Sequence, residues 1–122
     1  MNARLVGVDP WSRNREIPLA QLPVLIGRSP EAAVRLDDRW ASRRHCEISE
    51  LEGKLVVRDL ESRHGTFVNG RLISQALLLP GDRLTVGATV FEAQYDHDHS
   101  EKLTLSQVRQ EKAQNLELAF AS

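Results

Sequence analysis

Short runs of alternating apolar and polar residues, separated by turn residues, constrain the fold of this chain more than any other feature. The runs are 4–8, 16–20, 24–27, 34–36, 46–51, 55–60, 66–68, 71–73, 77–79, 84–86 and 90–95. Asn69-Gly70 is the strongest turn signal, because a two-residue type I′ hairpin turn needs positive φ at both central positions. The roughly ten-residue spacing of the runs predicts an all-β fold, a two-sheet antiparallel β-sandwich of about 10–11 strands.

Length and composition narrow the class of protein. The 122 residues, 41% of them hydrophobic, suffice for one packed domain with a tail. The 16 basic and 17 acidic side chains nearly cancel, which disfavours a nucleic-acid partner. No run approaches the roughly 20 apolar residues that span a bilayer, so we expect no membrane partner. The single cysteine, Cys46, cannot form an internal disulfide, and this predicts a cytoplasmic protein.

The alternating pattern stops after Tyr95. Residues 96–102 are polar and lack strand character, so we expect a domain over residues 1–96 and a polar linker and tail over 97–122. Asp96-His97-Asp98-His99 is an alternative metal-binding run, but we interpret it as a solvated linker and predict no metal.

The tail contains one helix signal. Thr104 followed by Gln107 matches a capping box. The pattern predicts a helix over about 105–118 whose apolar stripe consists of Leu105, Val108, Leu116 and Phe120. Three outcomes are open for this helix: it packs back on the sandwich, docks a partner or has no fixed structure. Thr104 is either the helix cap or, once phosphorylated, an internal ligand.

The candidate binding residues follow the predicted strands. Arg28 comes directly after the run that ends at Gly27, and its guanidinium fork suits a phosphate group, although a solvated surface arginine is the simpler interpretation. Ser42 and His45 precede the run that begins at Cys46. At this spacing the serine can face a ligand while the histidine turns inward to hold the loop.

The order and spacing of five strings give the chain a clear family resemblance. The strings are Gly27-Arg28, Ala41-Ser42-Arg43-Arg44-His45, Asp59-Leu60-Glu61-Ser62, Gly65-Thr66-Phe67-Val68-Asn69-Gly70 and Leu79-Pro80-Gly81-Asp82-Arg83-Leu84-Thr85-Val86-Gly87. With them the chain resembles a forkhead-associated domain over about residues 4–96. The resemblance implies a β-sandwich that binds phosphothreonine peptides.

The resemblance also implies roles for individual residues. Arg28 and Ser42 would grip the phosphate, with Arg43 beside them. His45 would support the loop without touching the ligand. The other loop-supporting and turn positions would be Gly27, Gly65, Thr66, Asn69 and Gly70.

The chain departs from the family pattern at Arg63-His64. Similar domains have a serine or threonine and then an asparagine here, and that asparagine binds the peptide main chain. Neutral imidazole offers one donor and one acceptor, so His64 would replace it in part. We therefore expect altered peptide preference and, if His64 touches the ligand, pH-sensitive affinity. Arg63 either adds a second cation to the site or points to solvent.

Other interpretations stay open. Ser42, His45, His64 and Asp59 include the residue types of a hydrolase, but the context of Ser42 lacks a nucleophile elbow, so we expect no catalysis. We predict that Trp40 plugs its loop onto the sandwich rather than contacting a peptide.

Trp11 is expected to form a lid on the sandwich edge. The chain is thus predicted to be an adaptor without cofactor that binds phosphothreonine in a Ser/Thr kinase or its substrate. The alternative function is a phosphate-independent scaffold or dimerisation domain.

Overall fold

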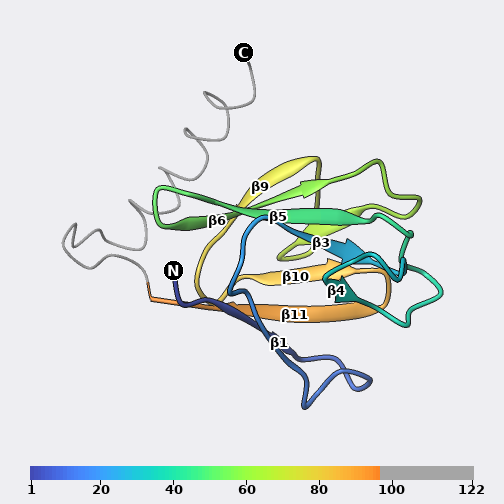
Figure 1. Cartoon of the computed structure of the whole chain (residues 1–122). Coiled ribbons are helices and arrows are strands. Elements are labelled where there is room, and N and C mark those ends of the chain that lie inside the picture. Colours follow the sequence, from blue (N-terminus) through green and yellow to red (C-terminus); the bar gives the residue numbers. More distant parts are fainter. Residues whose placement is uncertain (97–122) are drawn as a thin grey trace.

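The computed structural model describes residues 1–96 as a two-layer β-sandwich (Figure 1). The predicted helix over 105–118 and the run His97 to His99 lie outside the described residues. The strands are β1 Arg4–Gly7, β2 Glu16–Pro18, β3 Val24–Gly27, β4 Val34–Arg35, β5 Cys46–Leu51, β6 Lys54–Asp59, β7 Thr66–Val68, β8 Arg71–Ile73, β9 Gln75–Leu78, β10 Arg83–Val86 and β11 Thr89–Gln94. The sandwich and its predicted number of strands are confirmed.

The two sheets have six and five strands. Their orders are β2-β1-β11-β10-β7-β8 and β4-β3-β5-β6-β9. All neighbours are antiparallel except β3 and β4, a parallel pair that the sequence pattern did not predict. The Asn69-Gly70 hairpin forms as predicted, with φ of 50° at Asn69 and 80° at Gly70.

The core fills the space between the sheets. Side chains alternate across each strand, so every second residue faces the core. On β6, Leu55 and Val57 are fully buried in the main core, while Val56 faces the opposite side of the sheet. The largest core side chains, including Phe91 of the six-stranded sheet and Ile48 of the five-stranded sheet, come from both layers and hold them together by apolar burial.

Candidate functional site

Strand register gathers the candidate residues at one end of the sandwich. Ile26 of β3 pairs with Cys46 of β5, which pairs with Asp59 of β6. The end of β3, the start of β5 and the end of β6 therefore share one end of the five-stranded sheet, at the right of Figure 1. Arg28 and Ser42 lie in loops at this end, and so does the β6–β7 loop with Arg63 and His64.

The Arg28 side chain is anchored by one nitrogen. Its Nε donates a hydrogen bond to the Ala41 carbonyl at 2.6 Å, and its main-chain N–H donates to Ser42 O at 3.0 Å. Within residues 1–96, no group accepts a hydrogen bond from its two Nη atoms. The exposed guanidinium is thus fixed in position with its terminal donors available for an anion.

Ser42 lies in the β4–β5 loop and is hydrogen-bonded to the β6–β7 loop. Its Oγ accepts a 2.9 Å hydrogen bond from the main-chain N–H of Arg63, which satisfies one lone pair of the hydroxyl. The hydroxyl proton remains for a second partner. Since the Arg28 N–H donates to the Ser42 carbonyl, the two residues lie on neighbouring backbone segments.

His45 joins the β4–β5 and β6–β7 loops from inside the protein. The side chain is fully buried. Nδ1 accepts from the Ser42 N–H at 3.0 Å, so this nitrogen carries no proton, and Nε2–H donates to Gly65 O at 2.8 Å. The imidazole therefore fixes the main chain on both sides of the site and is unable to reach a ligand.

A carboxylate shapes the β6–β7 loop. Asp59 accepts hydrogen bonds from the Ser62 N–H at 3.2 Å, from Ser62 Oγ and, at 2.7 Å, from Thr66 Oγ1. Ser62 Oγ also accepts from the Gly65 N–H at 3.0 Å. Gly65 has a φ of 90°, a conformation that favours glycine. These contacts present the Arg63 N–H to Ser42.

Gly27 allows the β3 end and the β4–β5 loop to approach closely. A Cβ at this position would overlap the main-chain carbonyl of Arg43, which accepts a 3.1 Å hydrogen bond from the Ser29 N–H. Both the Arg43 and the Arg63 side chains are exposed beside the site.

Trp40 and His64 form an aromatic pair on the rim of the site. Their ring centroids lie 5.6 Å apart in an edge-to-face arrangement, and the Arg39 guanidinium lies 5.3 Å from the Trp40 ring. Trp40 is 51% exposed, so the prediction that it plugs the loop is wrong. The structure also overturns the predicted lid, because Trp11 is 89% exposed.

Two further carboxylates hold the neighbouring loops, and the sequence analysis missed both. Asp38 accepts from the Trp40 N–H at 2.9 Å and from Ala88 and Thr89 of the β10–β11 turn at 2.8 and 2.7 Å. Asp9 accepts from Trp11, Ser12 and Val90. For Asp9 the available sequence signal was the Asp-x-x-Ser pattern that Asp9 to Ser12 shares with Asp59 to Ser62, whereas Asp38 does not match this pattern.

Asp9 predicts a loss of stability in acid. Burial alone would raise its pKa, but hydrogen bonds from Ser12, Val90 and Trp11 outweigh burial and hold the pKa below the usual value of 3.8. A carboxyl with a lowered folded-state pKa stabilises the fold above its unfolded pKa, and this contribution disappears as pH falls through the folded pKa.

We therefore expect the melting temperature to fall when pH drops below about 4. Asp9→Asn should lower the melting temperature at pH 7 and flatten its dependence on pH between 3 and 5, as measured by calorimetry. An equally steep dependence in Asp9→Asn and wild type would contradict this role.

The geometry does not assemble the hydrolase alternative. Both ring nitrogens of His45 bind main-chain groups, and Ser42 Oγ accepts from a main-chain N–H instead of donating to a base. Asp59 binds Ser62 and Thr66 rather than a histidine. A nucleophile needs a base within hydrogen-bonding reach, and both ring nitrogens of His45, the candidate base, are already hydrogen-bonded.

Asn69 and Gly70 lie away from the loops around Ser42. They follow the end of β7, whereas the site lies before its start. Asn69 donates to Asp82 Oδ1 at 3.0 Å and accepts from the Arg83 N–H at 2.9 Å. The structure thus places these two residues in support of the β7–β8 hairpin and not of the phosphate loops.

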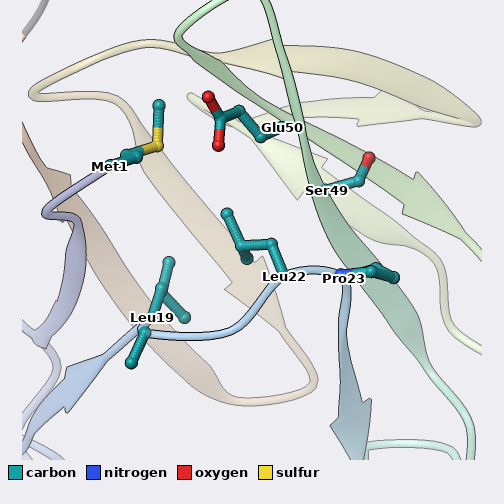
Figure 2. A pocket seen from close by; sticks show the side chains of 7 residues that line it. Met1, Leu19, Leu22, Pro23, Ser49 and Glu50 are labelled. Carbon is teal, nitrogen blue, oxygen red and sulfur yellow. The ribbon is translucent and has the colours of Figure 1, made fainter.

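Other features of the described residues carry no binding chemistry of this kind. Burial and the negative charge of Asp59 raise the pKa of Cys46 to about 12, which leaves its thiol protonated. A pocket of about 220 Å³ lies at the end of the sandwich where β3 begins. Figure 2 shows its lining side chains, among them Leu19, Leu22 and Glu50. In residues 1–96 there is no group of metal-ligating side chains and no helix able to cross a membrane.

Comparison with known families identifies the class of protein. The FHA domain model matches residues 24–87, more than half of the chain. The chain belongs to the family of FHA, or forkhead-associated, domains.

Curated relatives include the FHA domain-containing protein FhaB of Mycolicibacterium smegmatis, 36% identical over 77 residues, or 62% of this chain and 50% of FhaB. The oxoglutarate dehydrogenase inhibitor of Corynebacterium efficiens is 39% identical over 69 residues, which cover 57% of this chain and 49% of the inhibitor. The chain spans about half the length of these relatives.

Solved structures show the same fold. A structure from work on phosphothreonine-dependent FHA domain interactions has a TM-score of 0.71 and 29% identity, and the match covers 79% of this chain and 98% of that one. Mycobacterium tuberculosis EmbR in complex with a low-affinity phosphopeptide has a TM-score of 0.72 and 28% identity, covering 79% of this chain and 25% of EmbR.

Proposed function

We propose that the chain is a phosphothreonine-dependent peptide-binding module, an adaptor in Ser/Thr kinase signalling. The observation that carries this proposal is the pairing of Arg28 with Ser42. The guanidinium is anchored through Nε with its Nη atoms available, and the Ser42 hydroxyl has its lone pair satisfied and its proton available. A phosphate of about −1.5 to −2 charge accepts from both groups at once.

The rim residues would read the rest of the peptide. Arg43 and Arg63 supply exposed cations beside Ser42, and His64 with Trp40 supplies an aromatic surface. The binding unit would be residues 1–96, with 97–122 as a separate tail. The names of the solved relatives support phosphate dependence, since one was studied for phosphothreonine-dependent interactions and another was solved with a phosphopeptide.

We also propose that the module performs no catalysis and needs no cofactor, and that it acts in the cytoplasm. The first point rests on the commitment of His45 to the main chain. The proposed cytoplasmic location rests on the free, buried Cys46, which suits a reducing compartment. The partner would be a phosphorylated kinase or kinase substrate.

Peptide titration tests the central proposal. We expect a phosphothreonine peptide to bind at least about 100-fold more tightly than its unmodified form, because the phosphate is the group that both anchored donors meet. A phosphoserine version should bind more weakly than the phosphothreonine version. Calorimetric titration of the three matched peptides measures this. Equal affinity for phosphorylated and unmodified peptides would instead favour the phosphate-independent scaffold or dimerisation domain.

His64 should govern peptide preference. We expect His64→Asn to change the ranking of a phosphothreonine peptide library by a few-fold to tenfold, because an amide and an imidazole offer the peptide different hydrogen-bond donors and acceptors. Trp40→Ala, which removes the ring in edge-to-face contact with His64, is the companion variant. Identical rankings in wild type and His64→Asn would place His64 outside the peptide contact.

A further inference from the structure

Three exposed arginines, Arg28, Arg35 and Arg15, form a series along one edge of the sandwich. Arg35 Nε donates a hydrogen bond to Arg28 O at 3.3 Å, and Arg15 Nη2 donates to Arg35 O at 2.8 Å. Arg35 belongs to β4 and Arg15 directly precedes β2, and both strands are edge strands of their sheets. The arginine series therefore leads from the candidate site to the β1–β2 loop, which projects at the lower right of Figure 1.

The members of the arginine series share one arrangement. Each guanidinium donates from one nitrogen to a main-chain carbonyl, as Arg28 does to Ala41, and this contact fixes its position. Within residues 1–96, none of the three forms an ion pair with a carboxylate. A guanidinium has five N–H donors, so most donors of Arg15 and Arg35 remain available. This edge thus presents fixed positive charges to an anion from outside.

The β1–β2 loop holds Arg15 in place. The Arg15 N–H donates to Ser12 O at 2.8 Å, and the Arg15 carbonyl accepts from the Gly7 N–H at 2.8 Å. A Cβ at Gly7 would overlap the Ser12 carbonyl, so the loop packs tightly against β1. The Asp9 carboxylate closes the loop by accepting from Ser12 and from Val90 of β11. The loop is therefore a fixed support for the side chains that it carries.

This loop also presents Trp11 beside a groove of about 590 Å³. The groove is lined by residues that include Trp11, Arg13, Arg15, Leu36 and Asp37. Its lining has two cations against one carboxylate, so it favours an anionic occupant. The Trp11 indole is almost fully exposed although its main-chain N–H is bonded to Asp9. An exposed indole on a fixed backbone suits an interface, because it offers a large contact area at a small entropic cost.

We infer that Arg35, Arg15 and the groove beside Trp11 bind an acidic segment of the polypeptide whose phosphothreonine occupies the site at Arg28. This inference rests on the proposed function, since phosphate binding brings the segment to the arginine series. Aspartate or glutamate carboxylates pair with the guanidinium groups, and one apolar side chain packs on Trp11. Each exposed ion pair is weak alone, but the phosphate tether makes the second contact intramolecular.

Calorimetric titration with matched phosphothreonine peptides tests this inference. One peptide is short, and the others carry an extension rich in glutamate or the same extension with glutamine, placed either before or after the phosphothreonine. On one side, we expect the glutamate extension to bind about three- to tenfold more tightly than the glutamine extension, because several weak ion pairs act together. This gain should disappear at about 1 M salt, where the Debye length is only about 3 Å.

Variants assign the gain to particular residues. Arg15→Gln and Arg35→Gln should each reduce the gain about twofold or more, because each removes one exposed ion pair. Trp11→Ala should weaken binding of the extended peptides and leave the short one unaffected. Arg71→Gln is the matched control, because Arg71 is an exposed arginine of β8 at the opposite edge of the six-stranded sheet, and it should keep the full gain.

Two results would overturn this inference alone. One is equal affinity for the glutamate and glutamine extensions on both sides of the phosphothreonine, and the other is a full gain in Arg15→Gln and Trp11→Ala. The short peptide should bind Arg15→Gln and wild type equally. Because Arg15 does not contact Arg28, this variant keeps the test decisive even if Arg35→Gln alters the phosphate site. A short peptide that binds equally with and without its phosphate would instead overturn the proposed function, and this inference with it.

Discussion

Replacing Arg28 with alanine is expected to weaken binding of a phosphothreonine peptide at least about 20-fold. The variant leaves the phosphate without its charged, bidentate partner, and truncating one member of such a pair typically costs about 2–5 kcal/mol. Tenfold in affinity corresponds to about 1.4 kcal/mol, so the lower end of that range already gives more than a factor of 20. Calorimetric titration with phosphorylated and unmodified peptides measures the loss.

Two further variants sharpen this prediction. Arg28→Lys should rescue little, because a lysine has no Nε to bind the Ala41 carbonyl and presents a point charge instead of a fork. Arg4→Ala removes an exposed arginine whose partners are Glu16, 3.2 Å away on β2, and Gln94, 3.0 Å away on β11, and should leave affinity unchanged. Wild-type affinity in Arg28→Ala would exclude Arg28 from the phosphate site.

His45→Ala is expected to cause the largest loss of stability. The substitution leaves the Ser42 N–H and the Gly65 carbonyl without partners and opens a cavity in the interior. An unsatisfied buried polar group costs about 1–3 kcal/mol, and the lost packing adds to this. We expect unfolding to become easier by about 3–5 kcal/mol, or on the order of 15 °C in melting temperature.

The comparison with the other site histidine isolates the cause. His64→Ala removes an exposed ring and should leave the melting temperature within a few degrees of wild type. His45→Ala should also weaken phosphopeptide binding at temperatures where it remains folded, because both loops lose their shared anchor. A melting temperature near wild type in His45→Ala, measured by circular dichroism, would show that other contacts hold the loops.

Most strands could be predicted from the sequence because burial on a two-sided sheet imposes a period of two. The run 46–51 matches β5, and the Asn69-Gly70 turn fixes β7 and β8 on either side. The sequence did not predict the parallel β3–β4 pair, because a two-residue strand such as Val34–Arg35 has too few residues to show a period.

The site was predicted only partly, for a related reason. Arg28, Ser42 and His45 stand at strand ends, so the order of strands brings them together. The exposure of Trp40 depends on the loops that surround it in the folded protein, which the local sequence does not show. Its contact with His64 joins residues 24 positions apart. Asp38 shows the same limit, since its partners in the β10–β11 turn are distant in sequence.

Arg63 contacts Ser42 through its main-chain N–H and not through its side chain. Every amino acid except proline carries that donor, so side chains at position 63 can be exchanged while the serine keeps its support. His64 is likewise exposed, and its ring contacts Trp40 rather than the main chain around Ser42. Positions 63 and 64 are therefore the natural place to randomise when new peptide preferences are to be selected on this scaffold.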